Sequence, residues 1–358
     1  PRVARYLADE LIAAGFPEED VRVVPKGEFA TLIATYRGDG SAGRKPILLL
    51  GHLDVVEALA ADWERPPFTL TQDDVNYYAR GSIDNNSDAG GGDLDSNGDA
   101  VSYKIQAAEK TYATWEITVR NPGGHSSRPR DDNAIYELAD VIKAIEAHRF
   151  PVMWSEMTLS YFQNIGEQLG GELGETMVRF AYNPDDEHAA ERLRTEPSYV
   201  GSTRTTCVVT MLRAGHAENA LPQSATATVN CRIFPGVKAA DIQAELEAVV
   251  ANSGAEFELL TEVTESPISE LRADVLSAVS KAVHSRHPDL RLITYMSSGG
   301  TDAMHFRNAG IPTWGVGSIF MNPDEMYAHG LNERVPIKAF DEALDHWSII
   351  IRELTGAG

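Results

Sequence analysis

The sequence predicts an α/β domain that is interrupted by a smaller, inserted α+β domain. Between residues 110 and 261 the predicted elements follow the order strand, helix, strand, strand, helix, strand. This order is typical of an antiparallel, ferredoxin-like sheet with two helices on one face. The segments on either side combine apolar strands with amphipathic helices. With 358 residues and 43% hydrophobic content, the chain can bury more than one core, and its length indicates about two domains.

Residues 1–106 form the first part of the predicted α/β domain. The period of the apolar residues predicts a helix over Val3–Ala14, strands over Glu28–Tyr36 and Pro46–Leu50, and a loop over Ala60–Gln72. The second part covers residues 265–358. There we predict a helix over Arg272–His287, strands over Leu290–Tyr295 and Pro312–Val316, and a terminal helix over Ile337–Leu354.

The inserted domain is predicted over residues 107–264. Its expected elements are strand Lys110–Val119, helix Ala134–His148, strands Thr205–Leu212 and Ala225–Ile233, helix Ala239–Val250 and strand Glu256–Thr261. The stretch from about Phe150 to Tyr199 is acidic and contains glycine, and it is interpreted as an elaboration within this domain.

The two cysteines, Cys207 and Cys231, fall on two of these strands. If the strands pair as an antiparallel hairpin, the thiols lie nearly opposite, and a disulfide is geometrically possible. Two separate buried thiols are the favoured interpretation. Two cysteines are too few for a zinc site of their own.

The composition excludes two classes of partner. The net charge of −22 argues against binding to nucleic acid and to anionic membranes, because both require a basic surface. No apolar run approaches the roughly 18 to 20 residues that span a bilayer. The chain opens at Pro1 without a methionine, so we expect the natural N-terminus upstream. Localisation stays open between cytoplasmic and, if a signal was removed, periplasmic or secreted.

Three short motifs carry residues that bind metals. The apolar run at residues 48–50 leads into Gly51–Val56, which presents His52 and Asp54 two residues apart and therefore on one side of an extended backbone. The second motif is Arg80-Gly81-Ser82-Ile83-Asp84-Asn85, in which Asp84 follows a glycine turn. The third is Tyr327-Ala328-His329-Gly330, which contains His329. Each motif alone is a weak signal.

Taken together and in this order, the motifs resemble the co-catalytic dizinc metallopeptidases and amidohydrolases. This family includes glutamate carboxypeptidase, succinyl-diaminopimelate desuccinylase, acetylornithine deacetylase, aminoacylase and the carnosine-type dipeptidases. The resemblance covers nearly the whole chain, and Gly51–Val56 is its most specific part. It implies a zinc-peptidase α/β sandwich with an inserted dimerisation or lid domain.

The resemblance also implies a metal site with two zincs per subunit. It makes His52 a ligand of the first zinc, Asp54 a residue that orients the site, and Asp84 the carboxylate that bridges both ions. Asp88 matches a further acidic ligand of the first zinc, and His329 matches the ligand of the second. Cobalt or manganese would fit similar donors.

The chain departs from the family between Asp84 and Asp88. The family carries a Glu-Glu pair there, whose first member is the general base, but only three residues separate the two aspartates here. Four residues cannot supply the crossover of a dozen or more that parallel strands need. We therefore expect a further segment between Asn85 and Asn86 in the natural chain. The competing explanation is a real deletion that leaves a metal-binding or dimerising remnant without hydrolytic power.

Further matches concern the substrate. His125 lies in a Gly-His-Ser turn, and the resemblance implies that it donates to the substrate carbonyl oxygen in the partner subunit's site, whereas a histidine that only caps a turn is the alternative. Asn219 and Arg232 match groups that bind substrate polar atoms or a carboxylate; a surface salt bridge is the alternative for Arg232. Gly299, Gly300 and Thr301 match a glycine-rich substrate loop, for which a turn without a ligand is the alternative.

These matches predict a zinc-dependent exopeptidase or amidohydrolase. Its expected substrate is a small peptide or an N-acyl amino acid with a free carboxylate, and its expected partner is a second copy of the chain. The alternative is the non-catalytic remnant of the same fold.

Overall fold

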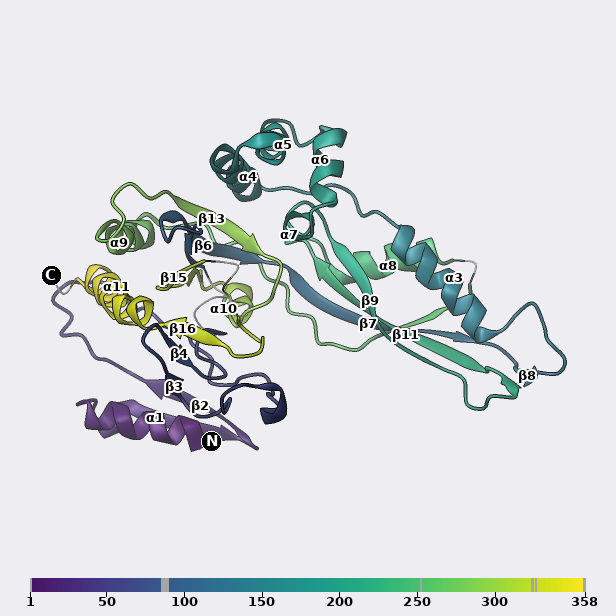
Figure 1. Cartoon of the computed structure of the whole chain (residues 1–358), viewed down its shortest axis with the longest axis horizontal. Coiled ribbons are helices and arrows are strands. Elements are labelled where there is room, and N and C mark those ends of the chain that lie inside the picture. Colours follow the sequence, from purple (N-terminus) through teal and green to yellow (C-terminus); the bar gives the residue numbers. More distant parts are fainter. Residues whose placement is uncertain (1, 85–89, 252, 323–324, 326, 357–358) are drawn as a thin grey trace.

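The structure is a computed structural model that describes residues 2–84, 90–251, 253–322, 325 and 327–356. Asp88 and the junction between Asn85 and Asn86 lie outside these residues, so what was predicted for them stays a prediction. Two larger sheets follow each other along the long axis of the molecule (Figure 1). No helix in the described part of the chain is both long and apolar enough to cross a membrane.

The chain begins with a helix on a hairpin. Helix α1 (Arg2–Ala13) packs on strands β1 (Val21–Lys26) and β2 (Phe29–Ala34), which pair antiparallel. Gly27 turns the hairpin with a φ of +62°, a conformation that glycine adopts without steric cost. The predicted first helix and the predicted strand over Glu28–Tyr36 are confirmed.

A five-stranded mixed sheet is the centre of the α/β part. Its strand order is β13-β6-β5-β15, with β14 also paired to β6. The strands are β5 (Gly91–Leu94), β6 (Ala100–Glu109), β13 (Leu292–Ser297), β14 (Gly315–Val316) and β15 (Phe320–Met321). Helices α9 (Ala273–His284) and α11 (Ile337–Thr355) pack against each other, and both contribute to the core that contains Tyr103 and Ile105 of β6. A separate sheet of β3 (Thr71–Gln72), β4 (Asn76–Tyr78) and β16 (Arg334–Pro336) lies beside α11.

The second large sheet has the predicted ferredoxin-like topology. Strands β7 (Thr111–Arg120), β9 (Thr206–Ala214), β11 (Ser224–Ile233) and β12 (Glu256–Leu259) are antiparallel in the order β12-β7-β11-β9. Alternate residues of β7 and β11 are buried, and they share one core with helices α3 (Ala134–Ala147) and α8 (Ala239–Val249). The predicted α/β fold with an inserted α+β unit is therefore confirmed, while the domain limits at residues 107 and 264 stay predictions.

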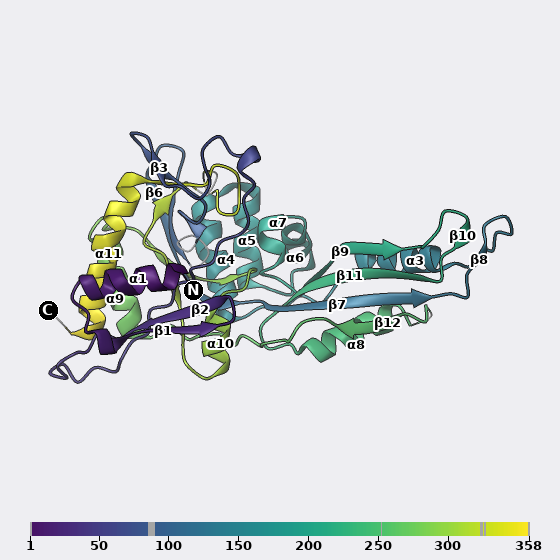
Figure 2. The same ribbon diagram turned by 90° about the horizontal axis from the view of Figure 1, so that it is seen from below.

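Four helices fill the stretch interpreted as an elaboration. They are α4 (Glu156–Leu169), α5 (Gly171–Tyr182), α6 (Glu187–Arg194) and α7 (Pro197–Val200). Their core centres on Phe162, Met177 and Phe180, and α4 packs on β13 of the first sheet. The helices therefore bridge from the inserted unit back to the α/β part, as both views show (Figures 1 and 2).

The predicted strand over Pro46–Leu50 is wrong. Residues 43–59 form neither helix nor strand, and Leu48, Leu49 and Leu50 are 62%, 52% and 44% exposed. A strand needs a neighbour to pair its backbone groups, and no described strand lies beside this segment. Three consecutive leucines in water indicate that the surface that would cover them is absent from the described chain.

The structure joins the two cysteines, contrary to the favoured interpretation of separate thiols. Cys207 on β9 and Cys231 on β11 are direct partners in the antiparallel register, and their sulfurs form a disulfide. The cross-link lies at the edge of the core of the inserted unit, where Cys231 is fully buried.

Replacing both cysteines with alanine is expected to lower the free energy of unfolding by about 3 kcal/mol, because the disulfide closes a loop of 24 residues in the unfolded chain. Urea unfolding with and without a reductant measures this difference. Thiol titration in denaturant is the direct check, since two reactive thiols in the untreated protein would contradict the cross-link.

Candidate metal and substrate site

The first motif packs against the turn that carries Asp84. Gly81 has a φ of +81°, and a Cβ at this position would lie 2.4 Å from Cγ1 of Val55. Only glycine therefore allows this close approach. His52 and Asp54 lie in the irregular segment beside it, where Nδ1 of His52 is 3.0 Å from the carbonyl oxygen of Asp54 and 3.5 Å from its carboxylate.

Asp84 and His329 come together from positions far apart in the sequence. Nε2 of His329 lies 2.9 Å from Oδ1 of Asp84, whose side chain is 4% exposed. His329 has a φ of +63°, which is uncommon for a residue other than glycine. Such a backbone conformation costs free energy, so it persists only where the surrounding structure enforces it. Residues of this kind cluster at functional sites.

Glu333 fixes the backbone that presents Asp84. One of its carboxylate oxygens accepts hydrogen bonds from the backbone N–H groups of Ile83 and Asp84, at 3.0 and 3.2 Å. The other accepts from Arg80 at 2.8 Å, and the two side chains are 0% and 3% exposed. The Arg80 guanidinium also lies over the ring of Trp63, 4.8 Å from its centroid. The buried Arg80–Glu333 pair therefore holds the backbone of Asp84 in place.

A Glu333→Gln variant is expected to lose about 3–5 kcal/mol of unfolding free energy, because it leaves Arg80 as a buried cation without a counter-charge. Chemical denaturation measures the loss. The matched control is Glu353→Gln, which removes the half-exposed pair with Lys281 and should change stability by at most about 1 kcal/mol. Equal effects of the two substitutions would contradict the structural role of Glu333.

Two of the predicted metal ligands lie together in the described part of the chain. Among them no three His, Cys, Asp or Glu side chains gather in a group that could hold an ion. Asp84 and His329 are the two predicted ligands that the structure brings within 3 Å of each other. The 2.9 Å contact is an ion pair between a carboxylate oxygen and an imidazole nitrogen, which are both donors that zinc accepts. Two tetrahedral zinc ligands bound at roughly 2.0–2.2 Å lie about 3.4 Å apart, so the pair is close to that separation without matching it. Asp88 lies outside the described residues.

His125 and Asn219 meet at the other end of the molecule. Strand β8 (Gly124–His125) pairs with β10 (Ala220–Leu221), and the backbone N–H of Ser126 donates to the carbonyl of Asn219 at 3.0 Å. Nδ1 of His125 accepts from the backbone N–H of Ser127 at 3.1 Å, so the neutral ring carries its proton on Nε2. Both views place β8 far from β16, next to which His329 lies (Figures 1 and 2).

The glycine-rich loop faces Arg232 across the junction between the two sheets. A Cβ at Gly300 would lie 3.9 Å from Nη1 of Arg232, and the Arg232 guanidinium stacks 4.7 Å from the ring centroid of Tyr112. Burial lowers the pKa of Arg232. Lys110 lies nearby, and its ammonium donates to the carbonyl of Arg204 at 2.7 Å. Burial, and secondarily the charge of Arg232, lower the pKa of Lys110 to about 7.

The sequence motifs did not reveal two carboxylates that organise these groups. Glu333 lies four residues after His329, and Glu109 lies at the end of β6, where it forms a second buried ion pair with Arg307. A signal for both carboxylates was present in the sequence: each is an acidic residue inside or next to an apolar strand. An acidic side chain at such a position is buried only when it is paired with a cation or a hydrogen-bond donor.

Comparisons with known proteins agree with this architecture. A family model described as the M20 peptidase dimerisation domain matches residues 107–258. N-fatty-acyl-amino acid synthase/hydrolase PM20D1.1 of Danio rerio is 23% identical over 91% of this chain and 75% of its own length. Aminoacylase-1 of Mus musculus is 23% identical over 98% of this chain and 89% of its own.

A solved structure shows the same fold. The M20 family metallo-carboxypeptidase Sso-CP2 from Sulfolobus solfataricus superimposes with a TM-score of 0.70 and 15% identity, covering 99% of this chain and 94% of that chain. The chain therefore shares the fold of an M20 family metallo-carboxypeptidase, its residues 107–258 match the peptidase dimerisation domain, and it is similar over most of its length to N-acyl-amino acid hydrolases and aminoacylases.

Proposed function

We propose that this protein is a zinc-dependent exopeptidase or amidohydrolase that cleaves the amide bond of a small peptide or N-acyl amino acid with a free carboxylate. The pairing of Asp84 with His329 at 2.9 Å, on a backbone held by Glu333, carries the proposal. The relatives that hydrolyse N-acyl amino acids and peptides support the same reaction class.

The proposed metal ligands are Asp84, His329, His52 and Asp88. When bound, divalent metal ions lower the pKa of a water molecule and polarise a carbonyl. The chain's own contribution is orientation: Glu333 accepts from the N–H of Asp84, and the carboxylate of Asp54 lies near the His52 ring. Such supporting contacts set the direction of the ligand lone pairs.

The general base is proposed to lie in a segment between Asn85 and Asn86 that this sequence lacks. The match to the Danio rerio relative runs over 392 residues, and 91% of 358 residues is about 326, so about 66 aligned positions have no residue of this chain. The exposed leucines at residues 48–50 are the surface that such a segment would cover. A unit of parallel strands with its crossover helix takes roughly thirty residues, so a segment of this length has room for about two such units.

A homodimer is proposed to bring His125 to the active site. Within one chain, β8 lies far from β16, the strand that follows His329 in the sequence (Figures 1 and 2), so a partner subunit would have to supply His125. Strand β9 is an edge of its sheet, and its Val208, Met211 and Leu212 are 57%, 60% and 61% exposed. An apolar edge strand in water favours pairing with a second copy.

Hydrolysis by protein isolated from its natural source tests the proposal. The assay offers N-acetyl-L-amino acids and dipeptides beside the same compounds with the carboxylate converted to an amide, and it measures the released amine. We expect cleavage of the acids, loss of activity with a chelator and recovery with zinc. Failure to cleave any acid after zinc loading would overturn the proposal.

The non-catalytic remnant is the second candidate function. The three residues between Asp84 and Asp88, with no Glu-Glu pair among them, favour it. It predicts zinc binding and dimer formation without turnover in the same assay.

A further inference from the structure

We propose that Glu109 is a positioning residue that holds the glycine-rich loop at residues 298–302 against Arg232, and so sets the affinity of the site for a carboxylate. The inference rests on the proposed function, in which this loop and Arg232 contact the substrate.

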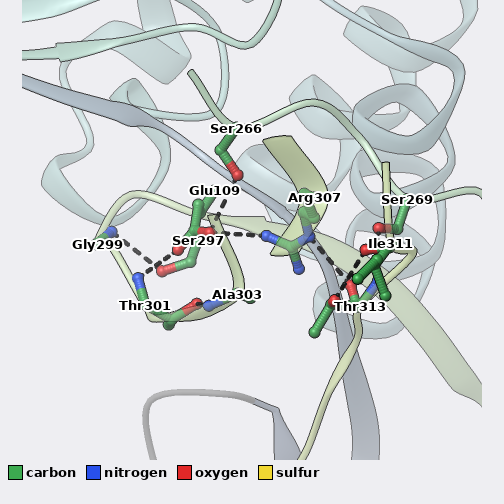
Figure 3. A network of polar contacts seen from close by, with 10 residues as sticks. All are labelled: Glu109, Ser266, Ser269, Ser297, Gly299, Thr301, Ala303, Arg307, Ile311 and Thr313. Atoms are coloured by element: carbon green, nitrogen blue, oxygen red, sulfur yellow. Dashed lines mark hydrogen bonds and ion pairs between the residues drawn. The ribbon is translucent and has the colours of Figure 1, made fainter. Parts of the chain in front are cut away.

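Glu109 uses both of its carboxylate oxygens inside the protein. It is fully buried, and its Oε1 accepts from Arg307 at 2.9 Å and from the Ser266 hydroxyl at 3.0 Å (Figure 3). Its Oε2 accepts from the backbone N–H of Thr301, the last step of the glycine-rich turn. In the buried interior these charge-assisted bonds fix the loop backbone more firmly than a turn alone would.

Arg232 approaches the same loop at Gly300. Gly300, next to Thr301, is the loop residue whose missing Cβ would come within 3.9 Å of the Arg232 guanidinium. No carboxylate of the described residues lies within ion-pair distance of Arg232. A half-buried guanidinium that faces a glycine backbone suits a substrate carboxylate, because its two N–H groups can bind both oxygens.

Glu109 also lies where two chain segments that connect the sheets pass each other: the link from β6 to β7 and the segment that returns after β12. Glu109 is the last residue of β6, and only Lys110 separates it from β7. Ser266 belongs to the returning segment, in which the N–H of Ser269 donates to the carbonyl of Ala107 at 2.8 Å. Arg307 extends the network to the Thr313 carbonyl at 3.0 Å (Figure 3). The position of the loop is thereby tied to both connections, and hence to the strand that carries Arg232.

A buried ion pair is weak evidence for stability, because apolar side chains of similar volume often replace one without loss. The acceptor for the Thr301 N–H is the feature that such a replacement cannot supply.

Two double variants separate the role of the ion pair from the role of the acceptor. Glu109→Gln with Arg307→Met keeps an acceptor for the Thr301 N–H, and Glu109→Leu with Arg307→Met removes it. Both double variants remove the two charges together and leave neither one buried without its partner, so both are expected to fold.

Calorimetric titration with N-methanesulfonyl-L-alanine and with its carboxamide measures the preference for the carboxylate. This probe carries a sulfonamide in place of the amide bond that would be cleaved. We expect the variant with Glu109→Leu and Arg307→Met to bind the acid at least about tenfold more weakly. Small displacements of a group that binds a ligand lower the affinity by this factor or more. Binding of the carboxamide should not change, and the Gln/Met variant should stay near the parent protein. Amide hydrogen exchange at residues 299–301 should be faster in the Leu/Met variant alone.

Equal acid affinity in the two double variants would overturn the role of Glu109. An Arg232→Gln variant distinguishes this failure from failure of the proposed function, because it should abolish the preference for the acid. If Arg232→Gln lost the preference while both double variants kept it, only the inference about Glu109 would fall. If Arg232→Gln kept the preference, another group would bind the carboxylate, and the inference about Glu109 would fall while the proposed substrate class would stand. A parent protein without a preference for the acid would overturn the proposed substrate class itself.

Discussion

Replacing His329 with alanine is expected to remove bound zinc and to lower amide hydrolysis by at least about a hundredfold, since even supporting residues around a metal contribute 10–100-fold. The reason is its position: Nε2 of His329 lies 2.9 Å from the buried carboxylate of Asp84, so an imidazole and a carboxylate that can both bind zinc face each other. Metal analysis and initial rates on the same preparation of the natural protein measure both effects.

Two further variants control for folding. His329 has a φ of +63°, so alanine there adds strain, whereas His329→Gly removes the imidazole without it. Both substitutions should lose zinc equally. His188→Ala, at an exposed position on α6, should keep zinc and activity. A His329→Ala protein with full activity would remove the basis for the metal site.

The chain of 358 residues, produced with this sequence, is expected to hydrolyse N-acetyl-L-amino acids at least about a hundredfold more slowly than protein from the natural source. A general base contributes roughly 10²–10⁴-fold to such reactions, and no Glu-Glu pair occurs between Asp84 and Asp88. Parallel assays at equal protein concentration measure the ratio.

The zinc content of both preparations is the control for this comparison, because a missing metal would slow the reaction for a different reason. Equal rates from the two preparations would show that the 358 residues already contain every group the reaction needs.

The inserted domain could be predicted closely from the sequence, because its strands obey a simple period. Successive residues of β11 alternate between core and surface, so the period of two places Ala225, Val229 and Ile233 on one face, and that face is the buried one. The order of its elements then fixed the antiparallel topology. Helix α3 was equally clear, since its apolar residues recur with the helical period and Asn133 caps it.

The strand predicted over Pro46–Leu50 shows where this reasoning fails. Its apolar composition is right for a buried parallel strand, but whether a strand forms depends on a neighbour that the described chain does not supply. Local sequence cannot report the presence of that neighbour.

The motifs predict Asp84 and His329 as ligands, and the structure places the two side chains 2.9 Å apart, while their role as ligands stays a prediction. The motifs do not indicate Glu333 and Glu109, which are buried carboxylates whose partners, Arg80 and Arg307, are about 200 or more residues away in sequence. Such pairs depend on tertiary contacts, which no local period encodes. The disulfide between Cys207 and Cys231 was a geometric possibility for the same reason, because it required the exact register of two strands.

Peptide mapping across residue 85 determines whether the natural chain carries a further segment between Asn85 and Asn86. Trypsin cleaves after Arg80 and Lys104 and at no position between them in this sequence, so the chain yields one peptide, residues 81–104. For protein from the natural source, we expect this peptide to be absent and a longer sequence, with adjacent glutamates in it, to join Asn85 to Asn86. Recovery of the peptide 81–104 in full yield would contradict the proposed segment and favour the non-catalytic remnant.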